Sequence, residues 1–153
     1  MSTLDTIDLK ILRLLQQSAD LGVVQISEQV GLSHTPCWRR IQRLQQSGVI
    51  RERVAILDPA KVGLPVSVFA QITMLSHKKA ALASFERAVQ SEPEIVGCYS
   101  ITGMSDYLIQ VVVADVAAYE RFLKERITQL PNVNQVHSTF ALREIKNTSA
   151  LPI

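Results

Sequence analysis

The sequence predicts an α+β protein of two domains, a helical one at the N-terminus and a mixed one behind it. Up to about Ser47, apolar residues recur at the three- and four-residue spacing of amphipathic helices. From Val66 onward, β-branched runs alternate with helical segments in the order βαββαβ. The stretch DPAKVGLP between them has two prolines and a glycine, which is typical of a connector. We therefore expect one domain with a linking strand at residues 1–57, a linker at 58–65, and a second domain at 66–153.

Composition excludes several classes of protein. The chain has 153 residues, 47% of them hydrophobic, which suffices for a real core. Its longest apolar stretch, 106–118, is interrupted by Gln110 and Asp115 before the roughly 20 residues that a membrane span needs. We expect no membrane partner. The start, MSTLDTIDLK, lacks the pattern of a secretory signal, so we expect a cytoplasmic protein.

The two cysteines predict neither a disulfide framework nor a metal site. Cys37 and Cys98 stand far apart in the sequence, whereas metal sites need clustered ligands. We expect both to be buried thiols, and we expect neither a metal nor a cofactor.

Three helices are predicted in the N-terminal domain. The first extends over Asp5–Asp20, and its early aspartates suit the positive end of the helix dipole. The second, at about Gln25–Val30, stops at Gly31, a residue that adopts the left-handed conformation of a tight turn. Ser33 is expected to cap the third helix through its hydroxyl. That helix continues to about Ser47, and the run VIRERVAIL at 49–57 then predicts a strand.

The third predicted helix has an apolar face and a basic face. Cys37, Ile41 and Leu44 fall on the buried side. The opposite side carries Thr35, Pro36, Arg39, Gln42, Arg43 and Gln46. Two helices joined by a short turn with glycine, the second presenting such a face, are typical of a helix-turn-helix domain, here of winged-helix-like type. We therefore expect double-stranded DNA as a partner.

Charge is distributed in a way that supports this expectation. The chain carries only +2 overall, but the segment 33–53 contains five arginines and one glutamate, a local charge of +4. A patch of that kind attracts phosphate even when the whole molecule is nearly neutral.

The second domain is expected to have a ferredoxin-like fold, in which an antiparallel sheet carries both helices on one face. The predicted strands are 66–75, 94–102, 107–114 and 135–144. The predicted helices are 78–91 and one that Asp115 caps and that Pro131-Asn132 ends.

The third strand of this domain predicts a dimer. Both alternating sets of its side chains are mostly apolar, whereas a sheet with one wet face would have polar residues on one of them. Since the helices cover only one face, a second copy of the same sheet is the simplest cover for the other. Such a dimer would present two recognition helices to two half-sites of DNA.

The sequence resembles the Lrp/AsnC (leucine-responsive, or feast/famine) family of transcription regulators. The resemblance rests on GLSHTPCWRRIQRLQQSGVI, AILDP and SITGMSDYLIQVVVAD, and it covers essentially the whole chain. It implies a regulator whose sheets pair in dimers that assemble into tetramers, octamers or higher species. It also implies an amino acid or related small molecule as effector, bound at contacts between dimers.

The resemblance also implies site residues. The residues that match the DNA-binding positions are Ser33, His34, Thr35, Pro36, Arg39, Arg40, Gln42 and Arg43. The residues expected to border the effector pocket are Thr102, Gly103, Met104, Ser105, Asp106 and Thr139. Two positions depart from the family pattern. His34 replaces a frequent proline and is a further candidate for a DNA contact, and Met104 stands where many members have an acid.

Several residues have two interpretations. Arg40 suits either a phosphate contact or an ion pair within the protein. Trp38 borders the buried face, which favours core or domain packing over base contact. Asp106 contributes to the effector pocket or accepts backbone N–H bonds in its own turn. The segment TSALPI at 148–153 is either a frayed tail or docks on a neighbour.

The leading functional hypothesis is a sequence-specific, nucleoid-associated transcription regulator that responds to a small metabolite. An architectural DNA-binding protein with little sequence preference is the alternative. An enzyme built on the ferredoxin-like fold is a further one, although the sequence has no evident nucleophile and base pair.

Overall fold

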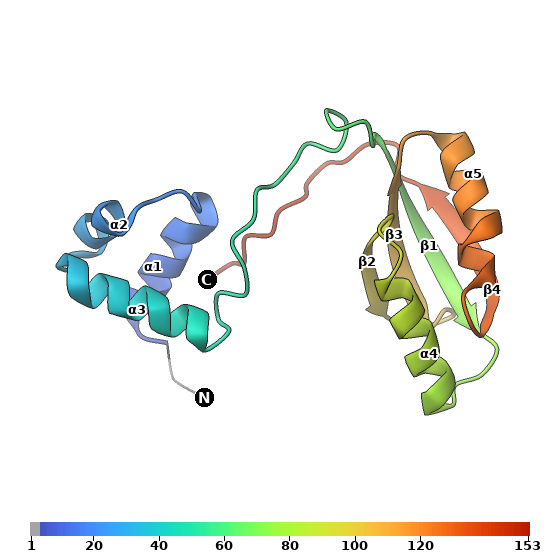
Figure 1. The fold of residues 1–153 in the computed structure, drawn as a ribbon, viewed down its shortest axis with the longest axis horizontal. Coiled ribbons are helices and arrows are strands. Elements are labelled where there is room, and N and C mark those ends of the chain that lie inside the picture. Colours follow the sequence, from blue (N-terminus) through green and yellow to red (C-terminus); the bar gives the residue numbers. More distant parts are fainter. Residues whose placement is uncertain (1–3) are drawn as a thin grey trace. The chain divides into compact units, whose positions relative to one another are not determined.

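The computed structural model describes residues 4–153, so the first three residues of the predicted DNA-binding domain lie outside the described part (Figure 1). The chain forms two compact units. One extends up to Ile56 and also includes Lys146–Ile153, and the other is Leu57–Ile145. The chain therefore passes from the first unit to the second and back again.

The first unit contains three helices, α1 (Thr6–Gln17), α2 (Val23–Val30) and α3 (His34–Gln46). Asp5 caps α1, because its side chain accepts a hydrogen bond from the N–H of Asp8 at 2.8 Å and Asp8 reciprocates at 3.2 Å. Gly31 ends α2 with a φ of 72°, the left-handed conformation that glycine adopts without strain. The core of this unit comprises Ile11, Leu12, Ile26, Val30, Cys37, Ile41 and Leu44. The predicted buried stripe of α3 is thereby confirmed.

Ser33 occupies the N-cap position of α3, but its hydroxyl makes no capping hydrogen bond. This part of the prediction was wrong, and Pro36 supplies the reason. A capping hydroxyl accepts from the second or third helical N–H, and Pro36, the third helical residue, has none.

The strand predicted at 49–57 is not formed. Residues 51–58 have no regular secondary structure and are all exposed. The apolar side chains of this stretch remain in solvent, Ile56 at 81% of its full exposure. Alternation predicts an extended conformation, but a strand also needs a partner, and no described strand of this chain pairs with the segment.

The second unit is a four-stranded antiparallel sheet in the order β2-β3-β1-β4. Its elements are β1 (Val66–Met74), α4 (Lys79–Gln90), β2 (Ile95–Ser100), β3 (Tyr107–Val113), α5 (Val116–Glu125), the short 3₁₀ helix η1 (Ile127–Gln129) and β4 (Val133–Phe140). The predicted βαββαβ order and the ferredoxin-like architecture are confirmed. Asp115 caps α5 as predicted, since its carboxylate accepts from the N–H of Ala118 at 2.6 Å.

Both helices of this unit pack on one face of the sheet. Phe85 and Val89 of α4 and Tyr119 and Phe122 of α5 share a single core with inward-facing residues of the strands. Those strand residues are Val68, Ala70, Ile72, Met74, Tyr107, Ile109, Val111 and Val113. Cys37 is buried as expected, but Cys98 is exposed, so the prediction of a second buried thiol was wrong. Cys98 lies on β2, the edge strand, where cover by the helices is incomplete.

The other face of the sheet carries apolar residues that no helix covers. Leu108 and Val112 of β3 lie on it, and so do Phe69 of β1 and Tyr99 of β2, both exposed. Gln71 and Gln110 share the same face. The face that the helices leave uncovered therefore carries apolar residues, as the sequence predicted.

Candidate DNA-binding face and effector turn

The exposed side of α3 gathers most of the predicted DNA-binding residues. With Cys37, Ile41 and Leu44 turned into the core, the opposite side of the helix faces solvent. The predicted residues that are exposed there are Ser33, His34, Thr35, Pro36, Arg39 and Arg43. Arg40 and Gln42 are half-buried. The spacing of apolar residues thus places a polar and basic surface on one helix.

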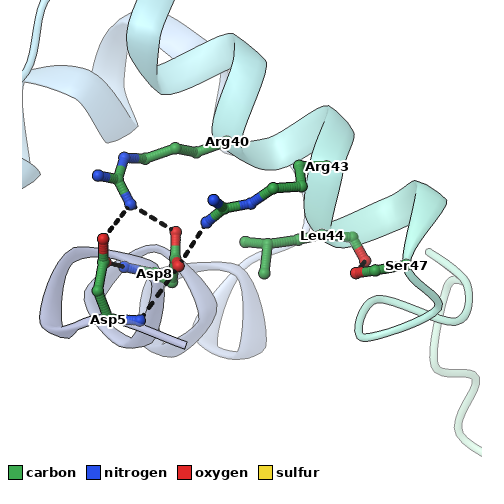
Figure 2. A network of polar contacts seen from close by, with 6 residues as sticks. All are labelled: Asp5, Asp8, Arg40, Arg43, Leu44 and Ser47. Carbon is green, nitrogen blue, oxygen red and sulfur yellow. Dashed lines mark hydrogen bonds and ion pairs between the residues drawn. The ribbon is translucent and has the colours of Figure 1, made fainter. Parts of the chain in front are cut away.

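Two arginines of this surface are bound by carboxylates of α1 and its cap (Figure 2). Nη1 of Arg40 donates to Asp5 Oδ2 at 2.6 Å and to Asp8 Oδ1 at 2.8 Å. Nη2 of Arg43 donates to Asp8 Oδ2 at 2.6 Å. Asp8 itself is fully buried. Of the two interpretations of Arg40, the ion pair within the protein is the one observed, and Arg43 has such a pair too.

Electrostatics favours the charged forms of Asp5 and Arg40. The N–H of Asp8, followed by the guanidinium of Arg40, lowers the pKa of the Asp5 carboxyl. The hydrogen bonds to Asp5 and Asp8 raise the pKa of Arg40. The carboxylate of Asp5 and the guanidinium of Arg40 therefore stay ionised at neutral pH. The sequence carries one signal for this network, the pair of early aspartates, whose position also suits the helix dipole.

Within residues 4–153, the other three arginines of the segment 33–53 are not bound by carboxylates, unlike Arg40 and Arg43. The side chains of Arg39, Arg51 and Arg53 are exposed and make no hydrogen bond or ion pair within the described residues. Trp38 is 46% exposed and lies outside the core of its unit, so the prediction of core packing was wrong, whereas packing between domains stays a prediction. A unit of three helices covers one stripe of α3, and Trp38 lies outside that stripe.

The predicted effector turn connects β2 to β3. The N–H of Ile101 donates to the carbonyl of Asp106 at 2.9 Å and closes it. Gly103 has a φ of 120°, a conformation that disfavours any residue with a Cβ. Met104 is 98% exposed and Thr102 is exposed, whereas Ser105 is buried and its hydroxyl donates to Gln71 at 3.5 Å.

Asp106 is fixed by the end of β1. Its Oδ2 accepts a hydrogen bond from the N–H of Met74 at 2.7 Å, and its Oδ1 lies 2.7 Å from Nε2 of His77. The Met74 N–H, followed by His77, lowers the pKa of the Asp106 carboxyl. The sequence suggested backbone donors in the turn itself, but the observed donor belongs to the neighbouring strand.

Thr139 is not brought next to this turn. It pairs with Phe69 on β1, whereas Asp106 lies beyond the pairing of Ile72 with Tyr107. Four residues of β1 therefore separate the two positions, which is about 13 Å along a strand. A surface hollow of this unit, lined among others by Glu94, Val113 and Arg121, includes none of the predicted effector residues.

Residues 4–153 offer neither a membrane-spanning helix nor a cluster of metal ligands. No helix there is long and apolar enough to cross a membrane. No group of three or more His, Cys, Asp or Glu side chains is arranged to hold a metal ion in that range.

Comparison with protein families decides what this combination is. Residues 67–151 match a family model described as the Lrp/AsnC ligand binding domain, and residues 4–51 match one described as winged helix-turn-helix DNA-binding. The chain belongs to the Lrp/AsnC family. It is a regulator of transcription that joins a DNA-binding helix-turn-helix to a ligand-binding domain.

Individual Lrp/AsnC proteins match over nearly the full length. The DNA-binding transcriptional activator DecR of Escherichia coli K12 is 40% identical over 150 residues, which is 98% of this chain and 99% of that protein. The crystal structure of an AsnC family regulator from Agrobacterium tumefaciens has a TM-score of 0.92 and 47% identity, covering 97% of both chains. A regulator from Neisseria meningitidis, solved as an L-Met complex, has a TM-score of 0.92 and 37% identity, covering 98% of this chain and 97% of its own.

Proposed function

We propose that this protein recognises specific DNA sequences through α3 and that an amino acid or related metabolite regulates it. The observation that carries the proposal is the solvent-facing polar and basic side of α3, held on a closed three-helix core. In this proposal residues 1–57 form the DNA-binding domain and 66–153 form the effector-binding and oligomerisation domain. It is neither an enzyme nor membrane-bound, and it works in the cytoplasm on the nucleoid.

Contacts to DNA divide between base edges and phosphates. His34, Thr35 and Gln42 provide donors and acceptors for base edges at the start and middle of α3. Ser33 and the ring of Pro36 shape the first helical turn. Arg39, Arg40 and Arg43 provide positive charge for phosphates.

Assembly takes place through the uncovered face of the sheet. Phe69, Leu108 and Val112 form the apolar centre of that face, and a second copy would bury them. Pairs of dimers then form tetramers, octamers or higher species. Thr139 is offset from the Asp106 turn by four residues along the sheet, about 13 Å, and β1 lies between their two strands. This separation supports a pocket completed by another copy, because one chain does not close around these residues.

The effector is an amino acid or a close relative of one. The L-Met complex of the related regulator supports this class of ligand. In our proposal Thr102, Gly103, Met104, Ser105, Asp106 and Thr139 border the pocket. Met104, with its exposed apolar side chain, would make no ion pair with the ammonium group, so we assign charge recognition to Asp106.

Two measurements test the proposal. Selection of duplexes from random sequence by the purified protein should enrich one motif, and that motif should bind at least about a thousandfold tighter than random DNA. Equal affinity for both would support the architectural alternative. A thermal-shift screen of the twenty amino acids should find one that raises the melting temperature by mass action. The absence of any shift at millimolar concentration would contradict an amino-acid effector.

A further inference from the structure

The carboxylate of Asp8, on α1, binds two arginines of the proposed DNA-binding face of α3. It is fully buried and uses both oxygens, one for Arg40 and one for Arg43 (Figure 2). Asp5 adds a second carboxylate to Arg40. The DNA-binding face is therefore built by two helices, although only α3 presents it.

Fold stability alone is a poor explanation for this network. Taking charges out of water is costly, and apolar residues of similar volume often stabilise a core as well as a buried ion pair does. The network does, however, fix where two long side chains lie. An exposed arginine side chain without a partner samples many rotamers, whereas Arg40 and Arg43 are each held at one terminal nitrogen.

Both guanidinium groups keep donors for another partner. An arginine has five N–H donors, of which the contacts to Asp5 and Asp8 use only those on Nη1 of Arg40 and Nη2 of Arg43. The side chain of Arg40 is 26% exposed and that of Arg43 is 49% exposed. Each arginine is thus held on one side by a carboxylate and open on another.

We propose that Asp8, assisted by Asp5, is a positioning residue for DNA binding. It orients Arg40 and Arg43 so that their remaining N–H groups donate to phosphates, and it lowers the side-chain entropy that binding would otherwise cost. This inference rests on the proposed function of α3.

The direction in which DNA affinity changes when a carboxylate is neutralised distinguishes this positioning role from a simple effect of net charge. Replacing a carboxylate by an amide makes the domain more positive by one charge. If only net charge mattered, DNA would bind more tightly. If Asp8 and Asp5 orient the arginines, DNA binds more weakly in spite of the added positive charge.

The test uses the full chain with Asp8→Asn, Asp5→Asn and, as a control for charge, Asp20→Asn. Asp20 is an exposed acid between α1 and α2 in the same unit. Asp5→Asn is expected to fold, because asparagine still accepts a capping hydrogen bond and Asp5 is half exposed. This variant therefore tests the positioning role if Asp8→Asn does not fold. Thermal unfolding of each variant establishes that it is folded. Affinity is then titrated at several salt concentrations on a duplex that the wild-type protein has selected.

We expect Asp20→Asn to bind as tightly as the wild type or more tightly. We expect the folded variants at positions 5 and 8 to bind roughly five- to tenfold more weakly. Equal or tighter binding by these variants would overturn the inference while the wild type still binds. Failure of the wild type to bind any duplex would instead overturn the proposed function on which the inference rests.

Discussion

The side-chain amide of Gln16 pairs with the main chain of Leu151 as a neighbouring strand would. The N–H of Leu151 donates to Oε1 of Gln16 at 2.6 Å, and Nε2 of Gln16 donates to the carbonyl of Leu151 at 3.2 Å. Nε of Arg13 donates to the carbonyl of Ile153 at 2.6 Å. The segment Lys146–Ile153 is therefore attached to α1, and both ends of the sheet unit lead into the helical one.

Replacing Gln16 by alanine should release this segment from α1. The Leu151 amide loses its acceptor, and an exposed hydrogen bond of this kind contributes about 1 kcal/mol. We expect the amide to exchange its hydrogen about five times faster, as measured by NMR. Gln17→Ala, at the exposed neighbouring position, should leave the exchange rate unchanged. An unchanged rate in the Gln16 variant would mean that other contacts hold the segment.

Arg39 and Arg43 should differ in what their loss does to the protein. Arg39 is exposed without a described partner, so Arg39→Ala should reduce the slope of log affinity against log salt by about one and leave stability alone. Arg43→Ala should reduce the slope in the same way. It should also lower the free energy of unfolding by about 1–3 kcal/mol, because one oxygen of the buried Asp8 loses its strongest donor.

Salt-dependent titration and urea unfolding of both variants make this comparison. The matched control is Gln46→Ala, at the exposed C-terminal end of the same helix, which removes no charge and no described contact. A salt slope that neither arginine variant changes would place DNA on another surface. Equal stability of the two variants would show that the bond from Arg43 to Asp8 contributes little.

Asp106 predicts a dependence of stability on pH. The pKa of its carboxyl is lower in the folded protein because of the Met74 N–H and, after it, His77. The folded state thus binds fewer protons than the unfolded one, in which an aspartate has a pKa of about 3.9. The contribution of Asp106 is fully present above that value and is lost as the pH falls through the lower folded pKa.

Asp106→Asn should make this contribution visible. At pH 5 the variant should be less stable than the wild type by about 1–2 kcal/mol, since the charged acceptor is replaced by a neutral one. The difference should narrow as the pH falls below 4. Urea unfolding across this range is the measurement, with Met104→Ala as a control in the same turn. A difference that stays constant down to pH 2 would argue against the lowered pKa.

Local patterns in the sequence sufficed for the elements of the fold but not for their long-range contacts. The stripe Cys37, Ile41 and Leu44 and the cap at Asp115 follow from spacing and residue type, and both are present. The bonds from Asp8 to Arg40 and Arg43 connect residues 32 and 35 positions apart, and only the packing of α1 on α3 brings them together. The sequence leaves open whether residues 148–153 fray or dock on a neighbour, and their attachment to α1 of the same chain likewise depends on long-range contacts.

The missing strand at 49–57 illustrates the same limit. Its alternating residues predict a strand, whereas residues 51–57 are irregular and exposed, because pairing depends on what lies beside the segment. The Ser33 cap failed for a local reason that the sequence does contain, since Pro36 removes one of the two N–H groups that a capping hydroxyl uses.

The core of the sheet unit gives a prediction that tests the independence of the two units. Phe85 is fully buried, and the centroid of its ring lies 4.6 Å from the ring centroid of Tyr107. Phe85→Ala should lower the free energy of unfolding of this unit by about 3–5 kcal/mol. The aromatic residues allow each unit to be followed separately. Trp38, the one tryptophan, belongs to the helical unit, and all three tyrosines belong to the sheet unit.

Urea unfolding of Phe85→Ala should therefore shift the tyrosine signal in near-ultraviolet circular dichroism to lower urea and leave the fluorescence transition of Trp38 in place. Separate hydrophobic cores are the physical reason, since the cavity left by Phe85 weakens only the side chains that surround it. Leu142→Ala, a fully exposed position, should shift neither transition. Equal shifts of the two signals would mean that the units unfold as one. The two connections of the chain, at residues 57 and 146, would then couple the stability of one unit to that of the other.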